Sequence, residues 1–496
     1  MALVGTIEDI VFRNDENGYT VAKLEKDGSL VTVVGKFIDV KVGAMVTLEG
    51  KFERSKFGVQ YAFTSYELTQ PKTIAGLEKY LGSGLIRGVG PITAKRIVET
   101  FGTDTLEILE YTPEKLSAIK GISEKKALEI GMSYREHKEV QNTIMFLQSY
   151  NISTNMSLKI YNVYHEKTAD IVKNNPYKLI EDIDGIGFTT ADRIAKSIGI
   201  PQDSAFRVRA GLIHVLKMSC EKNGNTYLPK NMLFGETEKA LDLNYEEHTE
   251  LFNNTFDTLC LDKTCVTLWN DNVEIVMLSK YYYYENSIAQ KLTWLKNVSK
   301  QNENDVDEDI KSFQERNKIE LHEEQIKAVK GAVNNGVYVI TGGPGTGKTT
   351  IIKCILEIFE NMKLRVALVA PTGRASKRMS DSTGREAKTI HRLLEVNVIK
   401  TNESYFMHNE SNPLKVDAVI CDEVSMVDCA LMCNLLKALP RDCKLILVGD
   451  KDQLPSVGAG NVLADILASG TIPFCMLTKI FRQGEKSLII TNAHLI

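Results

Sequence analysis

The sequence lacks any apolar stretch that approaches the roughly 20 residues a membrane-spanning helix needs. Residues 1–6 show no basic segment followed by an apolar one, so the start does not resemble a signal peptide. None of the nine cysteines forms a CxxC pair, and no Cys/His cluster has zinc-ligand spacing. These absences argue against a membrane protein, a secreted disulfide scaffold and a zinc protein. Scattered thiols of this kind are typical of reduced, buried cysteines in a cytoplasmic protein.

An excess of positive charge is also missing. The formal net charge is −4 and the pI is about 6.2, which excludes a binder of nucleic acid that is basic throughout. A local basic groove is not excluded, because binding depends on where charges lie rather than on their sum. The 496 residues predict about three domains at roughly 150 residues each, or more if some are small.

Residues 1–71 have the pattern of β structure. Five short apolar segments, some of them alternating, are separated by turns that contain glycine. Five strands in so small a module predict an OB-like barrel. Two roles stay open for it: docking of nucleic acid or protein, or a structural β cap.

Residues 72–200 are predicted to be all helical and to contain a recurring hairpin with one or two glycines in its turn. The three clear hairpins are centred on Gly88, Gly121 and Gly185. A longer repeat is also present, because Pro113 and Pro176 begin similar segments 63 residues apart. We therefore predict two copies of a double hairpin, with a fourth hairpin that has lost its glycines near residues 152–159.

Residues 201–300 carry a mixed pattern that fits a winged-helix-like module. Residues 301–320 are polar and charged, and we expect an exposed linker there. Residues 321–480 alternate short, wholly apolar segments with helical patterns, as a parallel sheet covered on both faces requires. The fold class is thus multidomain α/β, ending in a RecA-like P-loop sheet.

Residues 342–349 fit the phosphate-loop pattern G-x-x-x-x-G-K-[ST] and lie between a predicted strand and a predicted helix. Glycines let backbone N–H groups approach phosphate oxygens, and the helix N-terminus favours negative charge. Lys348 is expected to reach the β- and γ-phosphates, and the Thr349 hydroxyl to bind Mg²⁺. The expected ATP-binding residues of this segment are Gly343, Pro344, Gly345, Thr346, Gly347, Lys348, Thr349 and Thr350.

Further candidate residues flank the loop in the sequence. Asp422 and Glu423 end a buried strand, and we expect Asp422 to hold Mg²⁺ and Glu423 to activate the attacking water. Gln453, after the next strand, is placed to sense the γ-phosphate, and Arg482 to neutralise charge that develops on it. Gln325, one helix before the loop, is a candidate for reading the adenine edge.

Six motifs occur in an order that resembles the RecD-type DNA helicases of superfamily 1, in their longer, stand-alone form. They are the phosphate loop, residues 370–375, 389–394, 422–428 and 449–458, and Phe481-Arg482-Gln483. The resemblance covers nearly the whole chain. One departure is Lys479, where such helicases more often carry an acid.

The resemblance implies an ATP- and Mg²⁺-dependent motor that tracks single-stranded DNA 5′ to 3′, opens duplex forks, and serves repair or recombination. Residues 394–413 would form an inserted pin hairpin that splits the fork. Residues 481–496 would begin a second RecA-like lobe that is otherwise missing, so we expect a truncated chain. A cytoplasmic monomer without a membrane partner is expected. The residues expected to line the DNA track are Thr372, Gly373, Arg374 and His391.

The glycine hairpins resemble helix-hairpin-helix motifs, whose backbone N–H groups bind a DNA phosphate without reading bases. We expect Gly88 and Gly90 to take part, although such repeats also occur as mere scaffold. A rival function is also open for the whole chain. Without a second lobe, it would be an ATP-binding, DNA-binding scaffold that unwinds nothing.

Overall fold

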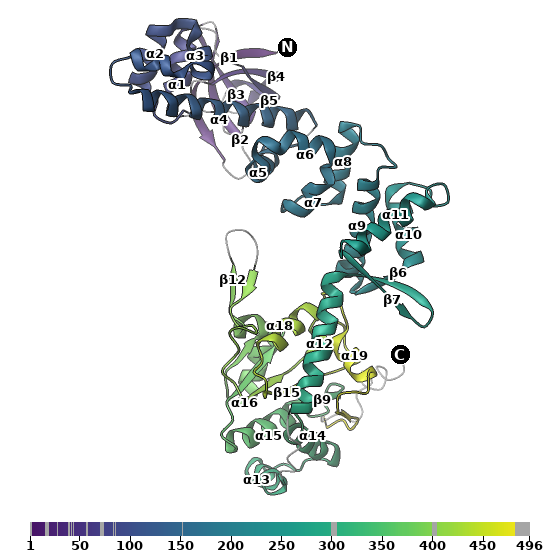
Figure 1. Ribbon diagram of the computed structural model, residues 1–496. Coiled ribbons are helices and arrows are strands. Elements are labelled where there is room, and N and C mark those ends of the chain that lie inside the picture. The colour runs from purple at the N-terminus through teal and green to yellow at the C-terminus, as the bar shows by residue number, and fades with distance from the viewer. Residues whose placement is uncertain are drawn as a thin grey trace. The chain divides into compact units, whose positions relative to one another are not determined.

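The computed structural model divides the chain into two compact units, Met1–Pro201 and Gln202–Ile496. Figure 1 shows the helices and strands of both units. The residues whose structure is described are 2–14, 19–26, 28–37, 40, 42, 44–55, 58–69, 74–82, 84, 86–150, 152–298, 305–398 and 404–481.

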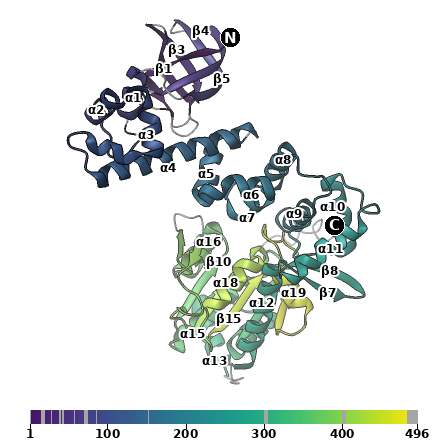
Figure 2. The same cartoon turned by 45° about the horizontal axis from the view of Figure 1, so that its top comes forward.

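A closed five-stranded barrel begins the first unit, which confirms the predicted OB-like module (Figure 2). Its strands are β1 (Leu3–Arg13), β2 (Tyr19–Lys26), β3 (Ser29–Lys36), β4 (Met45–Ser55) and β5 (Gly58–Thr69), in the order β1-β2-β3-β5-β4. Alternate residues face inward, as the two-residue period of a strand requires. The barrel core contains Ile7, Leu24, Val33, Val46 and Leu48, each fully buried.

The rest of the first unit is helical and forms the predicted double repeat. The first copy comprises α1 (Ile74–Gly82), α2 (Pro91–Phe101), η1 (Gly102–Asp104), α3 (Thr105–Tyr111), η2 (Pro113–Ala118) and α4 (Glu124–Ser149). The second comprises α5 (Thr154–Tyr164), η3 (His165–Lys167), α6 (Thr168–Asn174), η4 (Pro176–Lys178), α7 (Leu179–Asp182) and α8 (Phe188–Ile198).

The two copies agree in detail at an offset of 63 residues. The hydroxyls of Thr105 and Thr168 each donate a 2.7 Å hydrogen bond to the carbonyl three residues earlier, and both side chains are fully buried. The hairpin expected to have lost its glycines is present too, since Ser153 precedes α5 where Gly90 precedes α2. The repeat is therefore a structural repeat as well as a sequence repeat.

A winged-helix arrangement begins the second unit. Its elements are α9 (Ala205–Asn223), β6 (Tyr227–Pro229), α10 (Lys230–Leu241), α11 (Thr249–Leu261), β7 (Cys265–Asn270) and β8 (Val273–Leu278). The strands form a small antiparallel sheet in the order β6-β8-β7. The following helix, α12 (Ser279–Val298), buries Ile288, Leu292 and Leu295 in the core of the next domain.

A six-stranded parallel sheet forms that domain, which confirms the predicted P-loop fold. Its strand order is β11 (Ala387–Thr389), β10 (Val366–Ala370), β14 (Ala418–Cys421), β15 (Lys444–Gly449), β9 (Val337–Gly342) and β16 (Phe474–Leu477). Figure 2 shows helices on both of its sides. The core on one face is built with α12, α18 (Cys429–Ala438) and α19 (Val462–Ala468). The core on the other is built with α13 (Asp307–Asn317), α14 (Glu323–Asn334), α15 (Lys348–Asn361) and α16 (Gly373–Thr383).

The prediction of an exposed linker at residues 301–320 is wrong for residues 305–320, the part of it that the structure describes. Helix α13 folds onto the sheet domain there and buries Val306, Ile310 and Phe313 in its core. These residues recur at helical spacing within a sequence that is otherwise charged. The charged composition of this segment favoured a linker, but its few apolar residues form a narrow stripe on one face of a helix.

The predicted pin hairpin at residues 394–413 is present as a short antiparallel pair after α17 (Ile390–Leu393). Strands β12 (Val396–Val398) and β13 (Ser404–Phe406) pair in register, with Val396 opposite Phe406. Figure 1 shows β12 standing away from the sheet domain. The tip between the two strands lies outside the described residues. The role as a fork-splitting pin stays a prediction.

All nine cysteines are free, and all but the half-buried Cys260 are buried. Within the described residues, none of the helices combines the length and apolar character needed to cross a membrane.

Candidate active site

The phosphate loop joins β9 to α15 in a conformation that depends on glycine. Gly345 and Gly347 both have a φ of +85°, a region that L side chains rarely adopt. The Thr346 hydroxyl donates to the Gly343 carbonyl at 2.9 Å and closes the loop on itself. These glycine conformations and this hydrogen bond shape the backbone as a cradle.

Lys348 and Gln325 both contact this cradle. The Lys348 ammonium donates to the carbonyls of Gly342 and Gly343, the latter at 3.1 Å. The buried Gln325 amide accepts from the His322 N–H at 3.0 Å and donates to the Thr346 carbonyl at 3.1 Å. Lys348 thus lies within the loop, where its ammonium is expected to meet phosphate oxygens. Gln325 supports the loop backbone, and its contact with adenine stays a prediction.

Asp422 and Glu423 follow the fully buried strand β14, which β15 separates from the phosphate-loop strand. An Asp422 carboxylate oxygen accepts the Glu423 N–H at 2.9 Å. Burial raises the pKa of Asp422 above its ordinary value, while that hydrogen bond and the charges of Lys348 and Arg378 lower the pKa. A half-buried carboxylate of this kind suits a cation ligand, because a nearby cation favours its charged form.

Glu423 is strained and incompletely paired. Its φ of +54° places a non-glycine residue in the left-handed region. Oε2 is buried without a hydrogen-bond partner among the described residues, as is the nearby Ser425 hydroxyl. Oε1 lies 3.8 Å from the Arg378 guanidinium. Orphaned polar atoms next to Asp422 fit a site built for Mg²⁺, water and a nucleotide phosphate.

The remaining predicted catalytic residues are placed less tightly. Gln453 follows β15 with an exposed side chain, while its N–H donates to the carbonyl of buried Asp450 at 3.3 Å. Arg482 lies outside the described residues. The neighbouring Phe481 donates its N–H to the Gly345 carbonyl at 2.9 Å, and its ring lies 6.0 Å from that of His322. These two rings border the loop on the side of Gln325.

Family models match most of this chain in successive segments. The matched segments are residues 1–71 (ATP-dependent DNA helicase YrrC, OB-fold domain), 83–136 (SAM-like helix-hairpin-helix tandem), 136–227 (ATP-dependent RecD2 DNA helicase HHH domain) and 325–459 (AAA domain). The ATP-dependent RecD2 DNA helicase of Deinococcus radiodurans is 29% identical over 99% of this chain and 69% of that protein. Over nearly its whole length, the chain is similar to the RecD2-type DNA helicases.

Matches to other helicases cover less of the chain. The RecBCD enzyme subunit RecD of Mycolicibacterium smegmatis is 40% identical over 34% of this chain and 35% of that protein. A crystal structure of Pif1 helicase from Candida albicans is 24% identical, covers 35% of this chain and 43% of that one, and has a TM-score of 0.28. So low a TM-score carries no weight for function.

The predicted DNA-track residues lie near the start of α16 and on α17. Gly373 and Arg374 are exposed on the first turn of α16. The Thr372 hydroxyl caps that helix by accepting the Ala375 N–H at 3.2 Å. His391 is exposed, and its ring lies 5.9 Å from that of Phe406 in β13. Their contact with DNA stays a prediction.

The predicted hairpin contacts belong to the other unit. Gly88 has a φ of +83°, and Gly90 precedes α2 with open space where a Cβ would lie. A hollow of about 620 Å³ beside Gly88 is lined by Arg87, Lys125 and Lys126, with Glu129 and Glu136 on its wall. The open backbone at Gly90 leaves room for a phosphate, and the binding itself stays a prediction.

The sequence did not single out Arg378, and it assigned no role to the rings of His322 and Phe481. Arg378 follows Arg374 by one helical turn, and that spacing was the available signal. The other two rings come from segments about 160 residues apart that meet only because β16 pairs with β9.

Proposed function

We propose that this chain hydrolyses ATP to move 5′ to 3′ on single-stranded DNA, as the motor portion of a cytoplasmic helicase in DNA repair or recombination. One observation supports it above the others. A glycine-shaped phosphate loop and the half-buried Asp422-Glu423 pair meet at the carboxyl edge of one parallel sheet. The basic helix α16 begins at the same edge.

Each residue has a separate part in the proposed reaction. Lys348 leaves the loop carbonyls and offsets phosphate charge, and Thr349 and Asp422 hold Mg²⁺. When bound, Mg²⁺ neutralises charge on the phosphate oxygens. Glu423 accepts the proton of the attacking water through a carboxylate oxygen that has no partner among the described residues. Gln453 senses the γ-phosphate, and Arg482 stabilises charge in the transition state.

DNA would run past the start of α16 and past His391. Thr372 keeps the α16 N-terminus in place by capping it, while Gly373 and Arg374 present a backbone N–H and a guanidinium to phosphates. The β12–β13 hairpin would separate the strands at a fork. In the other unit, Gly88 and Gly90 would add contacts with the phosphate backbone that do not depend on sequence.

The test is ATP turnover by the whole chain, with and without single-stranded DNA. We expect DNA to stimulate turnover, and Lys348→Ala to abolish turnover and any unwinding. Glu423→Gln should lower turnover by about 10²–10⁴-fold while leaving nucleotide binding intact. Unwinding that survives Lys348→Ala would refute the motor. Nucleotide and DNA binding without turnover would favour a scaffold.

A further inference from the structure

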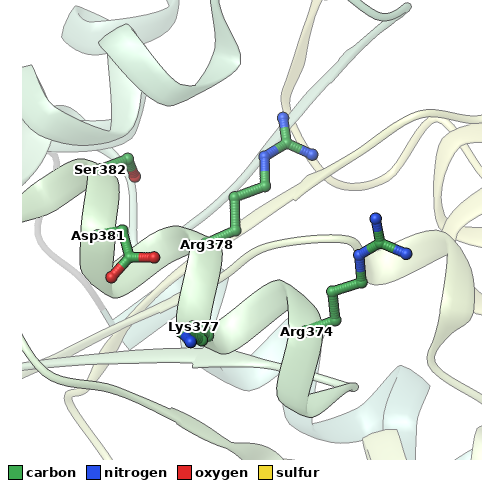
Figure 3. A pocket seen from close by; sticks show the side chains of 5 residues that line it. All are labelled: Arg374, Lys377, Arg378, Asp381 and Ser382. Carbon is green, nitrogen blue, oxygen red and sulfur yellow. The ribbon is translucent and has the colours of Figure 1, made fainter.

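Helix α16 presents two arginines one turn apart. Arg374 and Arg378 are four residues apart, a spacing that places them on the same helical face. Figure 3 shows both guanidinium groups extending to the same side of the helix. With Lys377, Asp381 and Ser382 they line an open hollow of about 490 Å³. Three cations against one acid make this hollow suited to an anion such as a backbone phosphate.

The two arginines differ in what they contact. Within the described residues Arg374 takes part in no ion pair, so its guanidinium is available to a ligand. Arg378 lies 3.8 Å from Glu423, the carboxylate that we propose as the general base. The Arg378 side chain is 75% exposed, whereas the Glu423 side chain is only 19% exposed. A solvated cation therefore holds a carboxylate that is largely removed from water.

This contact is loose enough to be exchanged. A separation of 3.8 Å exceeds the usual hydrogen-bond distance, so the pair is held mainly by charge. Guanidinium groups bind phosphate in a two-pronged geometry with shorter, stronger hydrogen bonds. A phosphate beside Arg374 would thus compete with Glu423 for Arg378. Glu423 would then be free to face the attacking water.

Resting on the proposed function, we propose that Arg378 is a positioning residue that links DNA binding to ATP hydrolysis. Without DNA it restrains Glu423 through the ion pair. A DNA phosphate seated between Arg374 and Arg378 draws Arg378 away and releases the base. DNA and Glu423 therefore compete for the Arg378 guanidinium, and this competition couples DNA binding to ATP hydrolysis.

The competition can be measured as DNA affinity, without ATP turnover. Coupling is reciprocal, so if DNA weakens the contact between Arg378 and Glu423, that contact must also weaken DNA binding. If Glu423 competes with DNA, Glu423→Gln should tighten binding of labelled oligo(dT) in the absence of nucleotide. We expect about a two- to five-fold lower Kd, the range for a partly exposed ion pair. Arg378→Ala should weaken binding several-fold, and adding Glu423→Gln to it should then have no further effect.

Lys377→Ala is the matched control, because Lys377 lines the same hollow and is not paired with Glu423. In that background Glu423→Gln should tighten binding by the same factor as in the unchanged chain. All Kd values are measured at one salt concentration, since phosphate contacts depend steeply on salt. Arg378 is exposed, so Arg378→Ala is expected to fold normally, and thermal unfolding checks this.

A second arm distinguishes a DNA phosphate from a nucleotide phosphate. Binding of a fluorescent ADP with Mg²⁺ should be unchanged in Arg378→Ala. A loss of ADP affinity with unchanged DNA affinity would overturn the proposal. So would a Glu423→Gln effect that is absent, or that persists in Arg378→Ala. If the unchanged chain binds no DNA at all, the proposed function itself fails, and this inference fails with it.

Discussion

Gly102 and His165 adopt the same unusual backbone conformation, 63 residues apart. Their φ and ψ values are 55° and −129° for Gly102, and 47° and −128° for His165. Gly102 follows α2 and His165 follows the equivalent helix α5, and each begins a short 3₁₀ segment. Glycine adopts this conformation without strain, whereas histidine does not. The second copy has therefore kept the turn and lost the residue that favours it.

His165→Gly should stabilise the first unit. Relief of strain is worth about 1–3 kcal/mol, and the extra freedom of glycine in the unfolded chain offsets about 0.5–1 kcal/mol of it. The change in the free energy of unfolding is measured by chemical unfolding of the whole chain, using the transition that belongs to the first unit. The reverse substitution, Gly102→Ala, should destabilise the first unit. If His165→Gly is less stable than the unchanged chain, the histidine ring stabilises the fold by more than the strained backbone destabilises it.

Glu423→Gly should raise stability while destroying turnover. The substitution relieves the positive φ and removes a buried oxygen that has no partner among the described residues. We expect a gain of about 1 kcal/mol in the free energy of unfolding without nucleotide, and at least a roughly 100-fold loss of ATP turnover. Glu423→Ala is the control, because it removes the carboxylate and keeps the strain. If Glu423→Gly is no more stable than Glu423→Ala, strain is not stored at this residue.

Gly90→Ala should test the hairpin as a phosphate site without disturbing the fold. A Cβ at Gly90 meets nothing within 4 Å, and its φ of −96° is open to alanine. The methyl group would instead occupy the space over the α2 N-terminus, so binding of labelled oligo(dT) should weaken several-fold at unchanged melting temperature. Gly88→Ala is expected to lower both, because Gly88 has a φ of +83°. DNA affinity that Gly90→Ala leaves unchanged would favour the scaffold role for this hairpin.

The Arg365–Asp417 pair should make the sheet domain sensitive to acid. Hydrogen bonds from the Arg365 side chain and N–H lower the pKa of Asp417 from 3.8 to about 2. A lowered pKa means that the stabilisation is complete above about pH 4 and is lost as the pH falls through about 2. Both side chains are considerably exposed, so we expect less than about 1 kcal/mol. Asp417→Asn should be less stable than the unchanged chain at pH 7, and the difference should close toward pH 2.

The local motifs were predictable because their chemistry is contiguous in the chain. The phosphate loop requires glycines and a lysine at set spacing within one strand-loop-helix unit, and Lys348 is found there. The double repeat was predictable for a similar reason, since Pro113 and Pro176 each begin a 3₁₀ segment. Helix α13 was missed because its charged composition outweighed three apolar residues at helical spacing.

Contacts between distant segments could be decided only by tertiary structure. Arg378 meets Glu423 because β10, which leads into α16, lies beside β14, and no pattern within either segment specifies that neighbour. Gln325 reaches Thr346 rather than solvent because α14 packs against the strand that carries the phosphate loop. Amino-acid order alone thus predicted which groups bind phosphate, Mg²⁺ and water. The order of strands in the sheet decided which of those groups face one another, because side chains from separate segments meet only where parallel strands end at a common edge.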